Sequence, residues 1–151
     1  MALVNIGYTK MPEGESSMEW TEKLSIGVPT IDSQHKELFK RINKLVLAIK
    51  QHRCKEEIDD TIKFLDDYAR VHFSAEEKHM RETKYPGLVE QREDHKKYLA
   101  ALAALKEQAS LPRVPGSSYD LSATTNQVVV DWIIEHIMKI DMKFGQYLKE
   151  H

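Results

Sequence analysis

The chain has 151 residues, a length typical of a single domain that can bury a hydrophobic core. Hydrophobic residues make up 41% and charged residues 30%, which is ordinary for a globular protein, and the formal net charge is only −2. This balance gives no general attraction to nucleic acid or to an anionic membrane, so neither is an expected partner. Cys54 is the single cysteine, which excludes an internal disulfide. Because the sequence has no long apolar run and no secretory signal pattern, we expect a cytoplasmic protein.

Glycine and proline recur near the N-terminus, which predicts an irregular arm over residues 1–29 and a helical domain over residues 30–151. The first helix is expected to begin near Thr30 or Asp32, either of which can serve as its N-cap. Its buried face follows the spacing of three and four residues that places side chains on one side of a helix. The residues on that face are His35, Leu38, Ile42, Leu45 and Ile49.

Two further helices follow the same spacing. The second is predicted from about Lys55 to about Thr83, and the third begins at the break formed by residues 85–87. The buried face of the second helix is expected to contain Ile58, Ile62, Leu65, Ala69, His72, Glu76 and Met80. The buried face of the third is expected to contain Leu88, Gln91, His95, Tyr98, Leu99 and Leu102.

Proline, glycine and serine over residues 112–118 predict a long loop before a fourth helix that runs from residue 121 or 122 to Lys149. The pattern shows neither strand-like alternation nor an internal repeat. Because short connections favour antiparallel neighbours, the sequence predicts an all-α fold, an antiparallel up-down-up-down four-helix bundle. The buried face of the fourth helix is expected to contain Val129, Trp132, His136, Ile140, Phe144 and Leu148.

Histidines and carboxylates interrupt the apolar face of every predicted helix. A buried imidazole or carboxylate without a partner is costly, so these residues indicate a shared ligand, and together they suit iron, zinc or manganese. Two carboxylates among four imidazoles fit two metals better than one zinc, which needs only three or four ligands. His136 and Asp141 are five residues apart, which overshoots one helical turn. The candidate ligands are His35, His72, Glu76, His95, His136 and Asp141.

These residues lie in segments that resemble hemerythrins, and especially the bacterial branch of that family. Residues 31–39 resemble the first helix of a hemerythrin, and residues 72–77 followed by Met80 resemble the second. Tyr85 and Pro86 with His95 resemble the third helix, and residues 132–137 with Asp141 resemble the fourth. Trp20 and residues 27–29 also fit the bacterial branch, so the resemblance covers residues 18–149.

The resemblance implies a non-haem di-iron site that binds dioxygen reversibly, for storage, delivery or sensing. It implies that Glu76 and Asp141 bridge the two irons, together with an oxo or hydroxo group. It further implies that His35 and His72 hold the iron with the open position, and that His95 and His136 hold the other iron. Phe73 and Trp132 are expected to pack in the core and to wall the ligand pocket.

One position departs from the family. Hemerythrins have a third histidine on the second iron, four residues before the position of His95, and this chain has Gln91 there. His79 lies three residues after Glu76 on the same helix face, and it would face Gln91 across an antiparallel hairpin. We therefore expect His79 as a replacement ligand, the alternative being a half-buried histidine that bonds to Gln91 or to water.

The altered ligand set leaves two classes of function open. The first is an oxygen-binding protein, which should form a stable oxygenated species. The second is a di-iron enzyme, namely an oxidase, a peroxidase or a nitric-oxide-reducing protein, which should turn over its substrate. A third interpretation is a sensing module of a signalling protein. An oxygen-binding protein is favoured over an enzyme.

Overall fold

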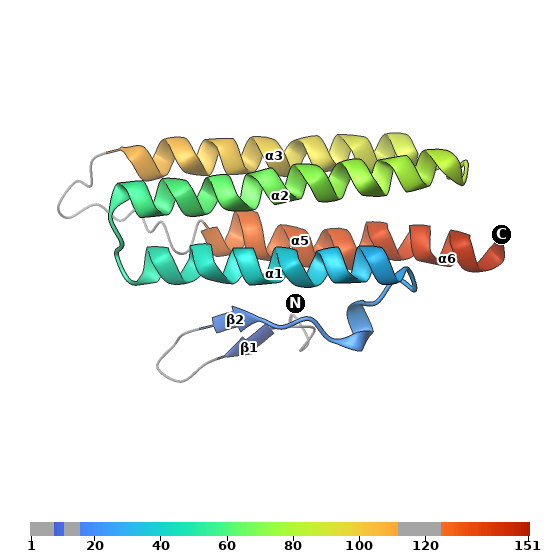
Figure 1. Ribbon diagram of the computed structural model, residues 1–151, viewed down its shortest axis with the longest axis horizontal. Coiled ribbons are helices and arrows are strands. Elements are labelled where there is room, and N and C mark those ends of the chain that lie inside the picture. The colour runs from blue at the N-terminus through green and yellow to red at the C-terminus, as the bar shows by residue number, and fades with distance from the viewer. Residues whose placement is uncertain (1–7, 11–15, 112–124) are drawn as a thin grey trace.

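The computed structural model describes residues 8–10, 16–111 and 125–151. Three long helices, α1 (Pro29–Lys50), α2 (Lys55–Glu82) and α3 (Leu88–Ser110), alternate in direction within this part of the chain. A fourth continuous helix runs antiparallel to α3 (Figure 1). It consists of η3 (Asn126–Asp131), α5 (Trp132–Glu135), η4 (His136–Asp141) and α6 (Met142–Glu150). The predicted up-down-up-down bundle is confirmed.

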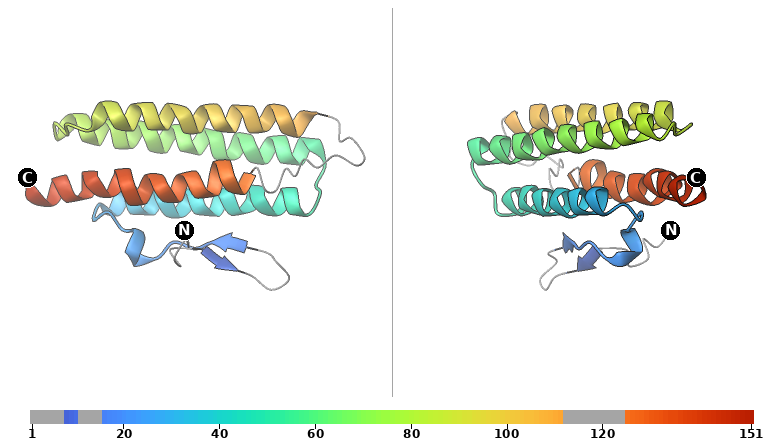
Figure 2. Two further views of the ribbon diagram at one scale, coloured as in Figure 1. Left: turned by 180° about the vertical axis from the view of Figure 1, so that it is seen from behind. Right: turned by 45° about the vertical axis from the view of Figure 1, so that its right-hand side comes forward.

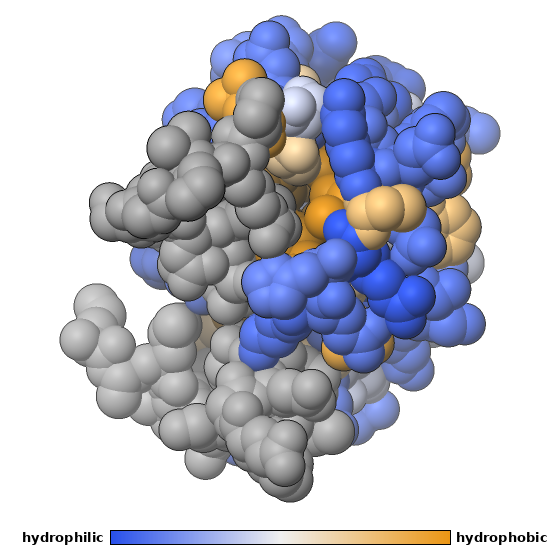
Figure 3. Space-filling view, turned by 90° about the vertical axis from the view of Figure 1, so that its left-hand side faces the viewer, coloured by the Kyte–Doolittle hydropathy of each residue, from blue (hydrophilic) through white to orange (hydrophobic). Residues whose placement is uncertain are grey.

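The helices form two layers, with α2 beside α3 in one layer and α1 beside the fourth helix in the other (Figure 2). The predicted long loop over residues 112–118, and the predicted start of the fourth helix, lie outside the described residues. No helix in the described part of the chain is both long and apolar enough to cross a membrane. Seen from the end where α1 stops and α2 begins, the described surface is mostly hydrophilic around a central group of hydrophobic side chains (Figure 3).

The fourth helix contains two wider turns, η3 and η4, which are π-helical. In such a turn the backbone hydrogen bond spans five residues instead of four, so every later side chain is shifted around the helix. The buried face predicted from regular spacing is therefore only partly correct. Trp132 and Ile140 are half-buried, whereas Ile133 and Ile137 are fully buried.

The described part of the N-terminal arm, residues 8–10 and 16–28, is more regular than expected. Strand β1 (Tyr8–Lys10) pairs antiparallel with strand β2 (Ser16–Met18), and a 3-10 turn, η2 (Glu22–Leu24), follows. The arm lies along α1 (Figures 1 and 2). The Asn43 carboxamide of α1 holds it there, since its oxygen accepts from Met18 N and its nitrogen donates to Met18 O, each at 2.8 Å.

The N-cap of α1 is Val28, not Thr30 or Asp32. Asp32 instead reaches back from the first turn of the helix, where its carboxylate accepts hydrogen bonds from Ile26 N at 3.0 Å and from the Ser25 hydroxyl. This fixes the end of the arm against α6, where a Cβ on Gly145 would collide with the backbone oxygen of Ile26. Glycine is required there by the close approach of the two backbones.

The buried apolar residues form two separate clusters. The larger cluster fills most of the bundle and includes Leu38, Tyr98 and Ile133. The smaller cluster closes the end at which α1 begins, and consists of Ile26, Ile31, Met80 and Phe144 with half-buried neighbours. On each helix, the fully buried residues between the two clusters are polar. A buried polar layer therefore crosses the bundle near this end.

Candidate metal centre

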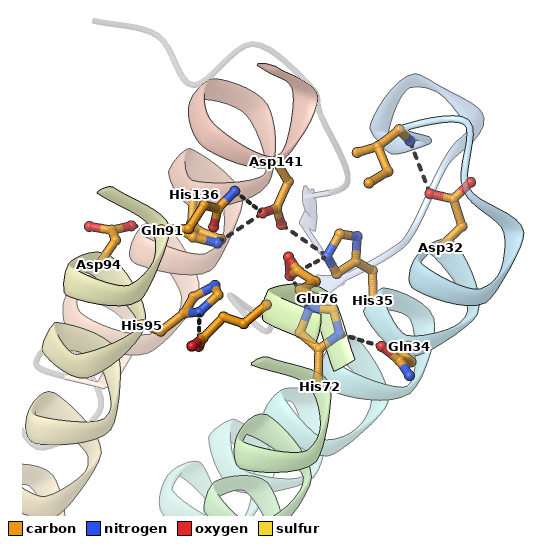
Figure 4. Close-up of polar contacts among 12 residues, drawn as sticks. Asp32, Gln34, His35, His72, Glu76, Gln91, Asp94, His95, His136 and Asp141 are labelled. Carbon is orange, nitrogen blue, oxygen red and sulfur yellow. Dashed lines mark hydrogen bonds and ion pairs between the residues drawn. The ribbon is translucent and has the colours of Figure 1, made fainter. Parts of the chain in front are cut away.

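Seven polar side chains from all four helices make up this layer, and none is more than 2% exposed. Because each helix crosses the layer at a different point of its length, residues distant in sequence converge on one place (Figure 4). The seven are His35 from α1, His72 and Glu76 from α2, Gln91 and His95 from α3, and His136 and Asp141 from η4. The structure thus brings together six of the seven candidate ligands. The seventh, His79, was expected only as a replacement for the histidine that is missing at the position of Gln91.

The first of two groups of donor atoms contains His35, His72, Glu76 and Asp141. One donor atom from each residue lies within 4.8 Å of all the others, a spacing that can surround one metal ion. His72 Nε2 is 2.7 Å from Glu76 Oε1, and His35 Nε2 is 3.1 Å from Asp141 Oδ2. Two imidazole nitrogens and two carboxylates therefore define one side of the layer.

The second group contains Glu76, His95, His136 and Asp141, with donor atoms within the same 4.8 Å. His136 Nε2 is 3.0 Å from Asp141 Oδ1, which is the oxygen on the opposite side of that carboxylate from His35. Glu76 and Asp141 belong to both groups. The two carboxylates are therefore shared by two potential metal positions, and each of these positions has two imidazoles of its own.

Most donor atoms of the layer are close together without being hydrogen-bonded to one another. The Nε2 atoms of His35, His72, His95 and His136 and both carboxylate oxygens of Glu76 are buried and have no hydrogen-bond partner. The short separations between them do not have hydrogen-bond geometry, because these atoms face common points rather than one another. Buried polar atoms are rarely left in this state in native proteins. A cation in each group would satisfy them, so the residues present fit a metal pair.

Outer hydrogen bonds hold three of the four imidazoles in place. Gln34 Oε1 lies 2.7 Å from His72 Nδ1, Glu77 Oε2 lies 2.9 Å from His95 Nδ1, and Asp94 Oδ2 lies 2.6 Å from His136 Nδ1. When Nδ1–H donates to such an acceptor, Nε2 is left with the lone pair that a metal needs. The second group therefore has two imidazoles backed by carboxylates, whereas the first has one backed by an amide.

Charge in the layer also favours cations. Burial alone would lower the pKa of His35, but Asp141 and Glu76 outweigh it and raise that pKa to about 9. The pKa of His136 is raised in the same way to about 10, against the opposing effect of burial. Burial favours a neutral Asp141, yet His136 and His35 hold the pKa of its carboxyl well below the usual range. Protons on the two histidines supply positive charge that a metal ion would otherwise supply.

His79 is not brought into either group. It is half-buried one turn beyond Glu76, and its ring meets Phe144 edge-on with 5.5 Å between centroids. Phe144 belongs to the smaller apolar cluster, so the turn after Glu76 has already left the polar layer. Gln91 is inside the layer instead, where its Nε2 donates to Asp141 Oδ1 at 3.0 Å.

Aromatic rings cover the layer on the side of the larger cluster. Phe73 stacks on His95 with 4.0 Å between centroids, and Trp132 stacks on His136 at 4.7 Å. Tyr98 links them, since it stacks on Trp132 and meets Phe73 edge-on. A surface groove of about 350 Å³ between α2 and α3 reaches Phe73 and His95. Its other lining residues are Arg70, Ser74, Glu77, Arg92, Lys96 and Leu99.

Comparison with known proteins identifies the family that this geometry belongs to. The Hemerythrin HHE cation binding domain matches residues 26–148, which is most of the chain. The chain is a member of the hemerythrin family. It is 30% identical to a bacteriohemerythrin of Campylobacter jejuni over 135 residues, covering 88% of this chain and 97% of the relative. It is 28% identical to a bacteriohemerythrin of Methylococcus capsulatus over 132 residues, covering 87% and 96%.

A solved structure supports the same assignment. The crystal structure of a hemerythrin variant superposes with a TM-score of 0.73 at 29% identity, and the match covers 85% of this chain and 95% of that chain. The hemerythrin family consists of non-haem iron proteins that bind dioxygen, and the buried donor atoms of this member are suitable for holding metal ions.

Sequence patterns did not reveal the outer partners Gln34, Glu77 and Asp94. Each directly precedes or follows a candidate ligand in the sequence. Consecutive residues of a helix point in different directions, so these side chains do not share the ligand face of their own helix. Their polar character alone does not distinguish them from ordinary solvent-exposed residues. Only the packing of the neighbouring helix shows that they face an imidazole.

Proposed function

We propose that this hemerythrin holds two irons, bridged by Glu76, by Asp141 and by an oxo or hydroxo group, and that it binds dioxygen reversibly. The observation that carries the proposal is that two groups of buried donor atoms share these two carboxylates. Each carboxylate has two oxygens and can contribute one to each metal, as is usual in sites with metals about 3.5–4 Å apart. A single zinc would leave part of the donor set unused.

In this proposal His35 and His72 hold one iron, and His95 and His136 hold the other. When bound, a pair of ferrous irons supplies the electrons that allow dioxygen to bind and to leave again. The protein orients three of the four imidazoles through the acceptors Gln34, Glu77 and Asp94, which fix those rings with Nε2 toward the centre.

The aromatic rings next to the second group have a protective role. Phe73 and Trp132 stack on the two imidazoles of that group and exclude water from their faces. Because these covering rings carry no proton donor on the faces that meet the imidazoles, they favour reversible binding over irreversible oxidation of the metals. This environment supports a binding role in storage, delivery or sensing of dioxygen.

The proposal is tested on the purified full chain after expression with sufficient iron. Metal analysis should give two irons per chain, and the ferrous protein should acquire a new visible absorption band in air that disappears when oxygen is removed. One zinc per chain, or no metal, would contradict it.

Gln91 favours a second candidate, a di-iron enzyme such as an oxidase, a peroxidase or a nitric-oxide-reducing protein. A weaker donor at this position would make the second iron easier to attack than in other hemerythrins. The two candidates differ in their products. An oxygen-binding protein should give an oxygenated form that is stable for many minutes, whereas an enzyme should consume peroxide or a reductant and accumulate diferric protein.

A further inference from the structure

We propose that Gln91 is itself a metal ligand, and that its carboxamide oxygen Oε1 binds the metal held by His95 and His136. This inference rests on the proposed function, since it assigns one more donor to the same pair of metals. Gln91 lies one helical turn before His95 on α3, so both side chains project from the same face into the polar layer.

The Gln91 side chain is only half satisfied in the structure. It is fully buried, and its Nε2 donates to Asp141 Oδ1, but its Oε1 has no hydrogen-bond partner. A buried amide oxygen without a partner is costly, and native proteins rarely retain one. The unpaired amide oxygen is therefore available to bind a cation in this layer.

The distances around Asp141 indicate where that cation would lie. His136 Nε2 and Gln91 Nε2 are each 3.0 Å from Asp141 Oδ1. Two donors that bind one metal at about 2.1 Å, at right angles, are about 3 Å apart. The outer end of the Gln91 amide therefore lies at a distance from Asp141 that suits a second ligand of the same metal, as His136 Nε2 does.

The oxygen can reach this position without movement of the helices. An amide nitrogen does not bind a metal ion, because its lone pair is delocalised into the carbonyl group. Rotation by 180° about the last side-chain bond exchanges Oε1 with Nε2, and side-chain amide oxygens are established metal ligands. On metal binding, Oε1 would replace Nε2 beside Asp141, and the hydrogen bond would give way to a shared metal.

The resulting ligand set has a distinct chemistry. From the protein, the second metal would receive two imidazole nitrogens and three oxygens, from Gln91, Glu76 and Asp141, whereas the first would receive two nitrogens and two oxygens. The imidazoles of the second metal are also the ones whose Nδ1 atoms face carboxylates, Glu77 and Asp94. Those carboxylates make the two rings stronger donors and compensate for a neutral amide oxygen.

The inference competes with the idea that His79 supplies the missing ligand. His79 is half-buried against Phe144 in the smaller apolar cluster, and it belongs to neither group of donor atoms. The variant His79→Leu is therefore a suitable control, because it removes the competing imidazole from the same end of the bundle without altering Gln91.

The test uses the iron-loaded full chain and three variants, Gln91→Leu, Gln91→His and His79→Leu. The readouts are irons per chain, the rate of iron transfer to a chelator, and the number of nitrogen and oxygen neighbours of iron from X-ray absorption. Gln91→Leu should release its second iron at least about tenfold faster than the unmodified chain, in line with the loss of a supporting metal contact. Gln91→His should retain two irons with one more nitrogen neighbour, and His79→Leu should behave as the unmodified chain.

The outcomes separate this inference from the proposed function. Fewer than two irons in the unmodified chain would refute the proposed function, and the inference with it. Two irons together with unchanged release from Gln91→Leu, or fast release from His79→Leu, would refute the inference alone. If Gln91→Leu does not fold, a crystal structure of the iron-loaded unmodified chain decides, since Oε1 must lie within about 2.5 Å of a metal.

Discussion

Asp141 Oδ1 lies 3.0 Å from His136 Nε2, although the two residues are five positions apart on one helix. In a regular α-helix a separation of five residues rotates the second side chain about 140° past the first, away from a common site. The π-helical turn η4 begins at His136 and ends at Asp141, and its wider path brings both side chains to the same face. The turn is the structural reason why this pair can serve the same site.

A deletion experiment follows from this relationship. Removal of the exposed Lys139 should convert η4 into a regular turn in which His136 and Asp141 are four positions apart, so the two side chains should still face each other and two irons should still bind. Removal of the exposed Ser74 from α2, where the turn is already regular, should rotate Glu76 and every later residue of α2 by about 100° relative to the buried face that precedes the deletion. Metal analysis of both variants should then show iron loss only in the second; equal loss in both would contradict the role assigned to η4.

The two carboxylates that we propose as bridges, Glu76 and Asp141, should matter more for iron content than any other carboxylates of the bundle. Glu76→Ala or Asp141→Ala should reduce the iron content from two per chain to one or fewer, because each removes a donor from both groups at once. Glu82→Ala, an exposed change near the end of the same α2 helix, is the control and should leave iron content unaltered. Iron content is measured by metal analysis. The same iron content in all three variants would show that Glu76 and Asp141 do not bridge the metals.

The outer carboxylates should tune metal affinity without binding metal. Asp94→Asn removes the charge 2.6 Å from His136 Nδ1, which should weaken iron retention by about 10–100-fold in competition with a chelator. The adjacent change Glu93→Gln is a matched control, because Glu93 is exposed and pairs only with the surface residue Lys96 among the contacts described. Equal retention in both variants would show that the contact with His136 has no influence on the metal.

The regular helices were predictable because the spacing of apolar residues in the sequence matches the residues that are buried in the structure. Every residue expected on the buried faces of α1 and α2, from His35 to Met80, is buried, since regular helices repeat the same face along their length. The same reasoning predicted that six polar residues would converge, because each interrupts an apolar face at a matching level of an antiparallel bundle.

The remaining features depend on interactions that sequence spacing does not encode. The π-helical turns shift Trp132 and Ile140 from the expected buried face, and nothing in the local propensity of residues 126–141 indicates them. His79 was expected in the layer because it continues the spacing of Glu76, but the layer is only about one turn deep and Phe144 occupies the next level. The hairpin of the arm depends on tertiary contact with Asn43.

Stability of the metal-free chain should decrease as the pH rises above neutrality. The pKa values of His35 and His136 are raised from 6.5 to about 9 and about 10 by Asp141 and Glu76, which outweigh the opposing effect of burial. Between 6.5 and these values the folded chain binds more protons than the unfolded chain. The stabilisation is fully present below about pH 6.5 and is lost as the pH rises through 9 and 10.

Thermal unfolding at several pH values, with and without iron, measures this effect. The melting temperature of the metal-free chain should fall from pH 7 to pH 9.5, because deprotonation leaves Glu76 and Asp141 buried without compensating charge. The iron-loaded chain should show a much smaller decrease, since metal ions replace the protons as the source of positive charge. Equal pH dependence of the two forms would mean that the histidine protons and the metals do not compensate the same carboxylates.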